Sequence, residues 1–591
     1  MNKTAKQLLC LLLALALALT ATGCNKKAGK KTGKKNSAKS SSSAPFSSSQ
    51  GAEDLNEEEE NADPFEENEE DAVEYTQLGV ANGSTPLNTN FLGFGVVHMS
   101  IGYLPDGTGA GRLPMEDWQV EKEFDRIAKT MRVGMVRTIY GPAMVWDQKQ
   151  QKFEWDPEKN AALKGFYKGI NEWQKRKVQV AISPIWGLSG LLETDNSWKN
   201  ADAKSVNYTG FEGKGLTVNG DYQTTLQNFK SFVSKTVLNL EANGIHNARL
   251  LTAFTECNNT YLYINAPKGA KALPQDATTH ERRRYDILCQ NYADAIKTLD
   301  AGLKESGLRS KYKIIGPCDV FQNDNNLDYT DPEQYSVLTK YTLEHLSGYV
   351  DIIGTHQYSN GNDFVDSVYY DNVETTMGKT IRMAKAAGKQ IWLDEFNASL
   401  NGSMAYDERV IVNADPVHGV AQAATYCGIL NSGLNTAFLW SVADVQWPNM
   451  RSNFEFRNGL QLGGLMPSPL VSNIPYKPWY AVSLITRYTA AGTVYRCEQG
   501  SDLYLSVLKR QDGRYTVIVV NYNVEEMPVR LNFEKSLGKQ TFYRHLYTTS
   551  DVVPTAEAKI IGTSHILKNV TRTLHDTLPG YSVAVYTTDP D

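Results

Sequence analysis

Eight short apolar runs, separated by stretches with helical periodicity, constrain the fold of this chain most strongly. They lie at residues 91–100, 133–140, 178–186, 248–256, 312–320, 350–358, 390–396 and 436–444. Short buried strands that alternate with helices are typical of a parallel α/β fold. Because eight strand–helix units can close on themselves, we predict a TIM (β/α)8 barrel. The competing topology is a doubly wound open sheet, but no phosphate-binding glycine fingerprint follows the first run.

The pattern changes after residue 489. Short strands and turns replace the strand–helix units, and Asp512-Gly513 has the composition of a tight hairpin turn. We therefore predict a barrel domain over residues 75–489 and an antiparallel β-sandwich over residues 490–591.

The N-terminal segment has the composition of an export signal followed by a tether. Residues 1–24 contain lysines, an apolar run and then Ala-Thr-Gly-Cys, which resembles a bacterial lipobox. We predict that Cys24 carries lipid and anchors the protein to the outer face of the bacterial cell membrane, the alternative being ordinary cleavage and release. Residues 25–74 are rich in lysine, then serine, then acidic residues, and we expect a disordered tether.

Charge and cysteine content exclude several classes of protein. The net charge is −6, which argues against nucleic acid as a partner, because phosphate binding requires a concentrated basic face. The cysteines beyond Cys24 show no tight CxxC spacing, so neither a zinc site nor a disulfide framework is inferred. Histidines such as His98 and His356 are scattered, with no HxxxH or HExxH pattern, and we predict no catalytic metal.

Two of the predicted strands end in a glutamate within a polar cluster. Glu256 follows the fourth strand, and Glu395 ends the seventh in the stretch QIWLDEFN. Strands four and seven of an eight-stranded barrel face each other across its mouth. Two carboxyl groups about 5 Å apart would suit retaining glycoside hydrolysis, in which one attacks the anomeric carbon and the other transfers a proton.

Other polar and aromatic residues are expected around this pair. Arg137 ends the second strand and is a candidate partner for an ionised carboxylate, while His356 and Tyr358 follow the sixth strand and could bond the same carboxylate or a sugar. Asp394 is expected to be structural, because adjacent residues on a strand point to opposite faces. Trp440, near the end of the last strand, is the preferred platform for a sugar ring.

Long segments after several strands support a carbohydrate partner. They cover roughly residues 187–221, 257–279, 400–416 and 441–477 and are rich in tyrosine, tryptophan and asparagine. Aromatic faces cover the apolar side of a pyranose, and amides bond its hydroxyl groups.

Several of these stretches resemble a known group of enzymes. VRTIYGP after the second strand, DIIGTHQY at the sixth and LDEFNAS at the seventh are similar to motifs of clan A glycoside hydrolases, and most similar to those of family 39. The resemblance covers the barrel and the following β-domain. It implies that Glu395 is the nucleophile and Glu256 the acid/base residue.

One position departs from that pattern. The clan usually has asparagine before its acid/base glutamate, in contact with the sugar 2-hydroxyl, whereas this chain has Thr255 there. Threonine still offers a hydroxyl group, and Asn258 continues the motif, so Thr255 and Asn258 are predicted substrate contacts.

The sequence therefore predicts a surface-tethered retaining glycoside hydrolase that needs no cofactor. Three alternatives stay open: Glu395 forms a structural ion pair with Arg137, Glu256 is a solvated strand-end residue or a substrate contact, or the whole barrel binds glycans without cleaving them. A further rival, a solute-binding lipoprotein, would require two α/β lobes with a hinge.

Overall fold

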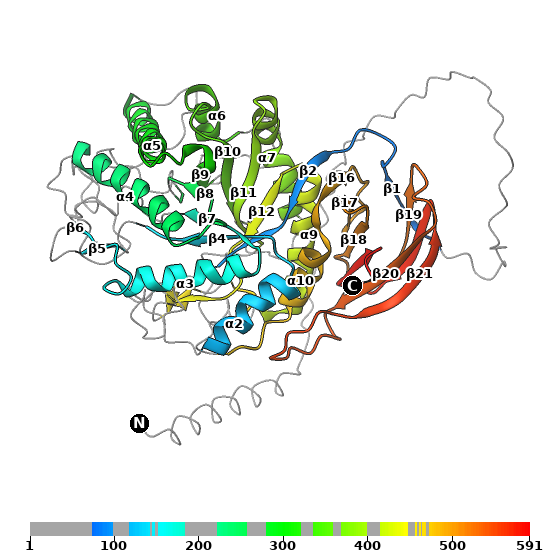
Figure 1. Cartoon of the computed structure of the whole chain (residues 1–591). Helices are drawn as coiled ribbons and strands as arrows, with labels where there is room; N and C mark the ends of the chain where they lie inside the picture. The colour runs from blue at the N-terminus through cyan, green and yellow to red at the C-terminus, as the bar shows by residue number, and fades with distance from the viewer. Residues whose placement is uncertain are drawn as a thin grey trace, which may run out of the picture. The chain divides into compact units, whose positions relative to one another are not determined.

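The barrel that the sequence predicts is present in the computed structural model (Figure 1). Each strand is parallel to its neighbours, and the strands follow one another around the barrel in chain order: β3 (Gly95–Val97), β4 (Met135–Ile139), β7 (Gln179–Ser183), β8 (Leu250–Thr252), β9 (Lys313–Val320), β10 (Ile352–Tyr358), β11 (Gln390–Asn397) and β12 (Thr436–Leu439). The pairing of β12 with β3 closes the cylinder. Closure excludes both an open doubly wound sheet and a two-lobed solute-binding fold.

The structure describes residues 74–98, 117–141, 145–147, 152–183, 222–253, 255–256, 279–320, 335–358, 368–398, 414–446, 456–457, 460–461, 464–467 and 472–590. The predicted signal with Cys24, the tether, Asn258 and most of the long segments after the strands lie outside these residues. Among the helices in the described ranges, none has the length and apolar content needed to cross a bilayer.

Helices alternate with the barrel strands and surround them (Figure 1). They are α2 (Asp117–Asp125), α3 (Ala161–Lys175), α4 (Tyr222–Ala242), α5 (Thr279–Glu305), α6 (Val337–His345), α7 (Val368–Ala386), α9 (Pro416–Ser432) and α10 (Pro478–Tyr488).

Helix ends follow local sequence signals. The Asn160 side chain accepts a hydrogen bond from the Leu163 N–H at the start of α3, and Asp415 does the same for Val417 at the start of α9. Gly244 and Gly307 follow α4 and α5 with φ of 68° and 72°, in the left-handed region that glycine adopts without steric cost.

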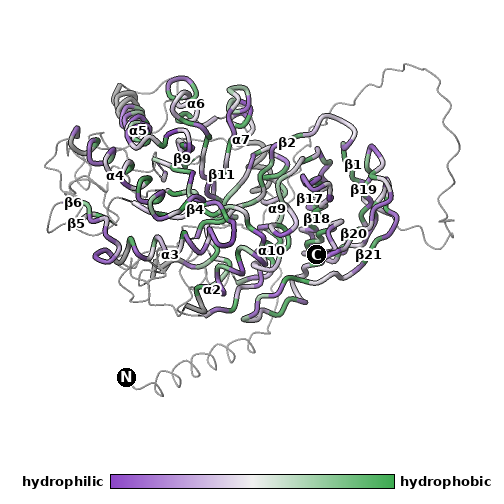
Figure 2. Tube along the Cα trace, in the orientation of Figure 1, coloured by the Kyte–Doolittle hydropathy of each residue, from purple (hydrophilic) through white to green (hydrophobic). Residues whose placement is uncertain are grey.

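Two apolar clusters form the core of the barrel, and the larger one continues into the C-terminal sheet. One cluster fills the space between strands and helices, and a smaller one, which includes Ile352, Trp392 and Phe438, lies inside the barrel. Figure 2 shows hydrophobic residues gathered along the barrel strands. Strand residues therefore alternate between an inner and an outer face, and polar residues on the inner face must be paired.

The C-terminal domain consists of two stacked sheets. The larger has the order β2 (Asn88–Gly93), β16 (Ala490–Tyr495), β17 (Leu503–Arg510), β18 (Tyr515–Asn521), β23 (Ser582–Thr587), β20 (Gln540–Thr548) and β21 (Thr563–Val570). The smaller contains β1 (Thr76–Val80), β19 (Met527–Phe533) and β22 (Thr573–Leu578). A third apolar cluster lies between them, and the predicted turn at Asp512-Gly513 joins β17 to β18. The predicted β-sandwich is thus confirmed.

Two N-terminal strands belong to these sheets. β1 pairs with β19 and β2 pairs with β16, so residues 76–93 complete the C-terminal domain, whereas the sequence placed them with the barrel. The barrel contacts the same domain directly, since Asn431 of α9 donates a hydrogen bond to the Leu505 carbonyl at 2.9 Å. The β-sandwich is therefore completed by N-terminal strands and contacts α9 of the barrel domain.

Candidate active site

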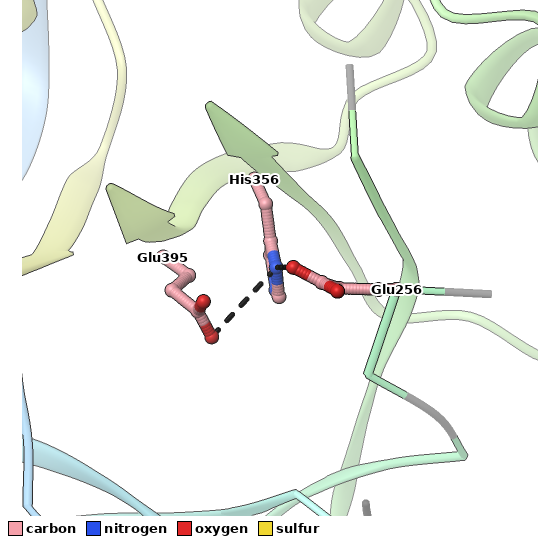
Figure 3. A group of neighbouring side chains, drawn as sticks. All are labelled: Glu256, His356 and Glu395. Carbon is pink, nitrogen blue, oxygen red and sulfur yellow. Dashed lines mark hydrogen bonds and ion pairs between the residues drawn. The ribbon is translucent and has the colours of Figure 1, made fainter. Parts of the chain in front are cut away.

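Polar side chains from opposite sides of the barrel meet at its carboxyl end. Arg137 comes from β4, Glu256 follows β8, His356 comes from β10 and Glu395 from β11. The ends of parallel barrel strands surround one mouth, which brings residues distant in sequence together. One oxygen from Glu256, one from Glu395 and one ring nitrogen of His356 all lie within 4.8 Å of one another. Figure 3 shows the His356 ring between the two carboxyl groups.

The carboxylate of Glu395 is held at both oxygens. Arg137 Nη1 donates to Oε2, and the hydroxyl of Tyr358 donates to Oε1. Glu395 is 4% exposed, so these contacts rather than solvent determine its orientation. Of the three candidate partners named from the sequence, Arg137 and Tyr358 bond this carboxylate, and His356 Nδ1 lies 3.7 Å from it.

Arg137 joins Glu395 to the neighbouring strands. Its Nη2 donates to Ser183 Oγ and to Thr255 Oγ1, each at 3.0 Å. Burial alone would lower the pKa of Arg137, but the charges of Glu395 and Asp394 raise it, and the guanidinium stays charged. The hydroxyl of Thr255, predicted to contact substrate, thus contacts protein groups, and the residue is 8% exposed.

Glu256 has an uncommon backbone conformation. Its φ is 55°, in the left-handed region, and its N–H donates to the Cys318 carbonyl at 2.8 Å. Cys318 itself has a φ of 56°. Non-glycine residues in this region cluster at functional sites, where the surrounding structure holds them. The resulting turn directs the Glu256 side chain to His356, with 3.4 Å between Oε1 and Nδ1.

His356 is fully buried between three carboxyl groups. Its Nδ1 lies 3.4 Å from Glu256 Oε1 and 3.7 Å from Glu395 Oε2, and its Nε2 lies 3.4 Å from Asp394 Oδ2. Burial by itself would lower the pKa of His356, but the charges of Glu395 and Asp394 outweigh it and raise the pKa to about 10. The ring is therefore an imidazolium at neutral pH.

Asp394 points into the same cluster because β11 contains a β-bulge. Thr355 pairs with Leu393 and His356 pairs with Glu395, so Asp394 is an extra residue in the ladder. A bulge shifts the inward and outward alternation by one residue. Asp394 Oδ2 lies 3.8 Å from Arg137 Nε, and the residue is 1% exposed. The expectation that Asp394 and Glu395 face opposite sides is wrong for this reason.

Two side-chain cations lie where a metal ion would otherwise balance the carboxylates of the cluster. Glu256, His356 and Glu395 are close enough for a metal ion, but His356 would have to give up its proton to bind one, and Arg137 already occupies Glu395. Arg137 and His356 supply two positive charges beside the carboxylates of Asp394 and Glu395. The charge arrangement thus suits proton transfer and nucleophilic attack better than metal binding.

Trp440 is largely buried. It is 6% exposed and belongs to the apolar cluster inside the barrel. Its carbonyl accepts a hydrogen bond from Asn397 Nδ2, and its N–H donates to the Phe396 carbonyl at 2.8 Å. A sugar contact through Trp440 stays a prediction, as does one through Asn258.

Sequence reasoning missed Ser183 and Cys318. Ser183 is the last residue of β7 and bonds Arg137, and Cys318 is the bulged residue between Pro317 and Asp319 in the pairing of β9 with β10. Ser183 ends its strand and so lies at the carboxyl end of the barrel, and this position was a usable signal. Nothing in the sequence around Cys318 indicates a bulge.

Comparisons with known proteins identify similar folds. No protein-family model matches the chain, and no curated protein matches it. Among solved structures, a GH30 endoxylanase from Clostridium papyrosolvens C71 is 12% identical, with a TM-score of 0.54 over 87% of this chain and 99% of that one. A family 30 subfamily 8 xylanase from Clostridium acetobutylicum is 13% identical, with a TM-score of 0.52 over 86% and 99%. An endo-β1,6-glucanase is 13% identical, with a TM-score of 0.50 over 88% and 95%. The likeness shows a barrel with an attached β-domain of the kind found in family 30 glycoside hydrolases, whereas the resemblance to family 39 rests on the short motifs alone.

Proposed function

We propose that this protein is a retaining glycoside hydrolase, with Glu395 as nucleophile and Glu256 as acid/base residue. The observation that carries the proposal is the approach of the two carboxyl groups to within 4.8 Å across the barrel mouth. Carboxyl groups of retaining glycosidases are about 5–5.5 Å apart, whereas inverting enzymes need a wider gap for water. The fold shared with xylanases and glucanases supports a polysaccharide or oligosaccharide as substrate.

The reaction would run in two displacements. A Glu395 oxygen attacks the anomeric carbon while the glycosidic C–O bond breaks, and the leaving oxygen takes the proton of Glu256. Water then gives a proton to the Glu256 carboxylate and attacks the same carbon, which releases Glu395. Arg137 and Tyr358 hold the nucleophile in place between the steps.

Covalent trapping tests the proposal. Incubation with a panel of 2-deoxy-2-fluoroglycosyl fluorides should add one sugar to the protein, and peptide mass spectrometry should locate it on Glu395. NMR of the first product released from an aryl glycoside should show the anomer of the substrate. Binding of matched glycans with no turnover and no label would favour the glycan-binding alternative instead.

Replacement of Glu256 by alanine should lower kcat/KM by an amount that depends on the leaving group of the substrate. We expect kcat/KM to fall about 10²–10⁴-fold for glycosides with a poor leaving group, because protonation of the departing oxygen is lost. Dinitrophenyl glycosides, whose leaving group needs no proton, should form the glycosyl-enzyme nearly normally, and azide should restore turnover. Equal losses on both substrate types would contradict the acid/base role of Glu256.

We also propose that Cys24 anchors the enzyme to the outer face of the membrane, as its lipobox-like surroundings suggest. In a bacterial host, labelled palmitate should enter the wild type and not Cys24→Ala. The variant should leave the membrane fraction, and its persistence there would contradict lipid anchoring.

A further inference from the structure

Asp394 is a buried carboxylate that the double displacement does not use. Within the described part of the chain, neither of its oxygens has an aligned hydrogen-bond donor, and its polar neighbours are the cations His356 and Arg137 and the thiol of Cys318. A buried charge is costly unless it is paired, so a carboxylate in this position compensates the charge of the cations beside it. The bulge that directs both Asp394 and Glu395 to the interior makes this pairing available.

His356 has a carboxylate oxygen next to each of its two ring nitrogens. Nε2 lies 3.4 Å from Asp394, while Nδ1 lies 3.4 Å from Glu256 and 3.7 Å from Glu395. A neutral imidazole donates from one nitrogen only, and its other lone pair would then face an anion. The carboxylates of Asp394 beside Nε2 and of Glu395 beside Nδ1 therefore favour an imidazolium, and Asp394 supplies the counter-charge on the side away from Glu256.

We propose that Asp394 is a positioning residue that keeps His356 as an imidazolium. The Nδ1–H of the ring can then interact with Glu395 before attack and with Glu256 in the glycosyl-enzyme. This inference rests on the proposed function. Glu395 carries the negative charge before attack, and Glu256 carries it in the glycosyl-enzyme. A cation that lies between them stabilises that charge in both states, and no proton leaves the ring. Without Asp394, His356 would lose a proton at a lower pH, and the neutral ring would place no positive charge beside Glu395 and Glu256.

The charged and titratable groups around His356 come from several strands. The carboxyl groups are those of Glu256, which follows β8, and of Asp394 and Glu395 on β11. Arg137 on β4 contacts both β11 carboxylates. Tyr358 contacts Glu395, and Cys318 on β9 contacts Asp394. Among these, Asp394 is the carboxylate that contacts Nε2. Its removal therefore changes the charge on one side of the ring and leaves both proposed catalytic carboxyl groups in place.

NMR of the full chain labelled with ¹⁵N-histidine tests the charge state without any substrate. The sequence has nine histidines, and the signals missing from His356→Gln identify the ring. At about pH 8 we expect both nitrogens of His356 to carry protons in the wild type and only one to do so in Asp394→Asn. Asp394→Ser is a second neutral replacement. A neutral ring in the wild type, or an imidazolium in a folded Asp394 variant at this pH, would overturn the proposal.

Asp300→Asn is the matched control. Asp300 is also buried and pairs with an arginine, at 2.6 Å from Arg309 Nε, but it lies near the amino end of β9 and not at the mouth. This variant should leave the His356 signals unchanged. A shift of equal size in both variants would indicate a general structural effect and contradict a specific role for Asp394.

Kinetics then test the consequence for catalysis. On an aryl glycoside that the wild type hydrolyses, kcat/KM of Asp394→Asn should be closest to wild type near pH 6. Above the lowered pKa of His356, the ratio of variant to wild type should fall roughly tenfold per pH unit. A ratio that is constant with pH would overturn the catalytic part of the proposal. Absence of wild-type turnover would contradict the proposed function. The NMR result would still decide whether Asp394 keeps His356 protonated.

Discussion

Glu395→Gln is expected to reduce kcat on aryl glycosides by at least about 10⁴-fold, because the amide cannot attack the anomeric carbon and no covalent intermediate forms. Glutamine has nearly the same shape as glutamate: its amide oxygen can accept from Arg137, and its NH2 group can donate to the Tyr358 hydroxyl. The variant should therefore fold and bind glycans while losing turnover. Stopped assays with long incubation measure the residual turnover, calorimetric titration with matched glycans measures binding, and the fluorosugar label should not form.

Glu123→Gln provides the control for this experiment. Glu123 is a second buried glutamate paired with a histidine, at 3.0 Å from His98, but it lies on α2 outside the barrel mouth. Its replacement should leave turnover within a few-fold of wild type. Retention of more than a small fraction of activity by Glu395→Gln would contradict nucleophilic catalysis by this residue and would favour a structural ion pair with Arg137.

Arg137→Met is expected to lower the free energy of unfolding by about 3–5 kcal/mol, because the substitution leaves buried carboxylates without one of their cations. Asp394 and Glu395 are both nearly inaccessible to water, and Arg137 contacts each of them. Urea unfolding followed by circular dichroism measures the loss. The addition of Asp394→Asn to the variant should recover part of the stability, since one unpaired charge disappears.

Arg176→Met is the comparison for Arg137. Arg176 also contacts two carboxylates, Asp125 and Glu172, at 2.7 and 2.6 Å, but these belong to the helices around the barrel and remain partly exposed. Water can solvate them after the substitution, so a loss of about 1 kcal/mol or less is expected. Equal losses from the two substitutions would show that burial of the Arg137 cluster does not determine its energetic importance.

Much of the site could be predicted because it depends on strand ends. Apolar runs identify the barrel strands, and the carboxyl ends of parallel strands share one mouth, so Glu256, Glu395 and Arg137 were expected to converge. The contacts of Arg137 and Tyr358 with Glu395 agree with that expectation. The partners of Thr255 were not predictable in the same way, because they come from β4 and β7 and depend on how three strands are packed.

The sequence by itself determined the number and order of the barrel strands, the turn at Asp512-Gly513 and the residues at the strand ends, because these follow from local periodicity and turn chemistry. Tertiary structure alone decided that residues 76–93 join the C-terminal sheets and that Asp394 faces inward beside Glu395. Both depend on which strands pair and in what register. Register is set by contacts between residues far apart in the chain, and a shift of one residue reverses the direction of a side chain.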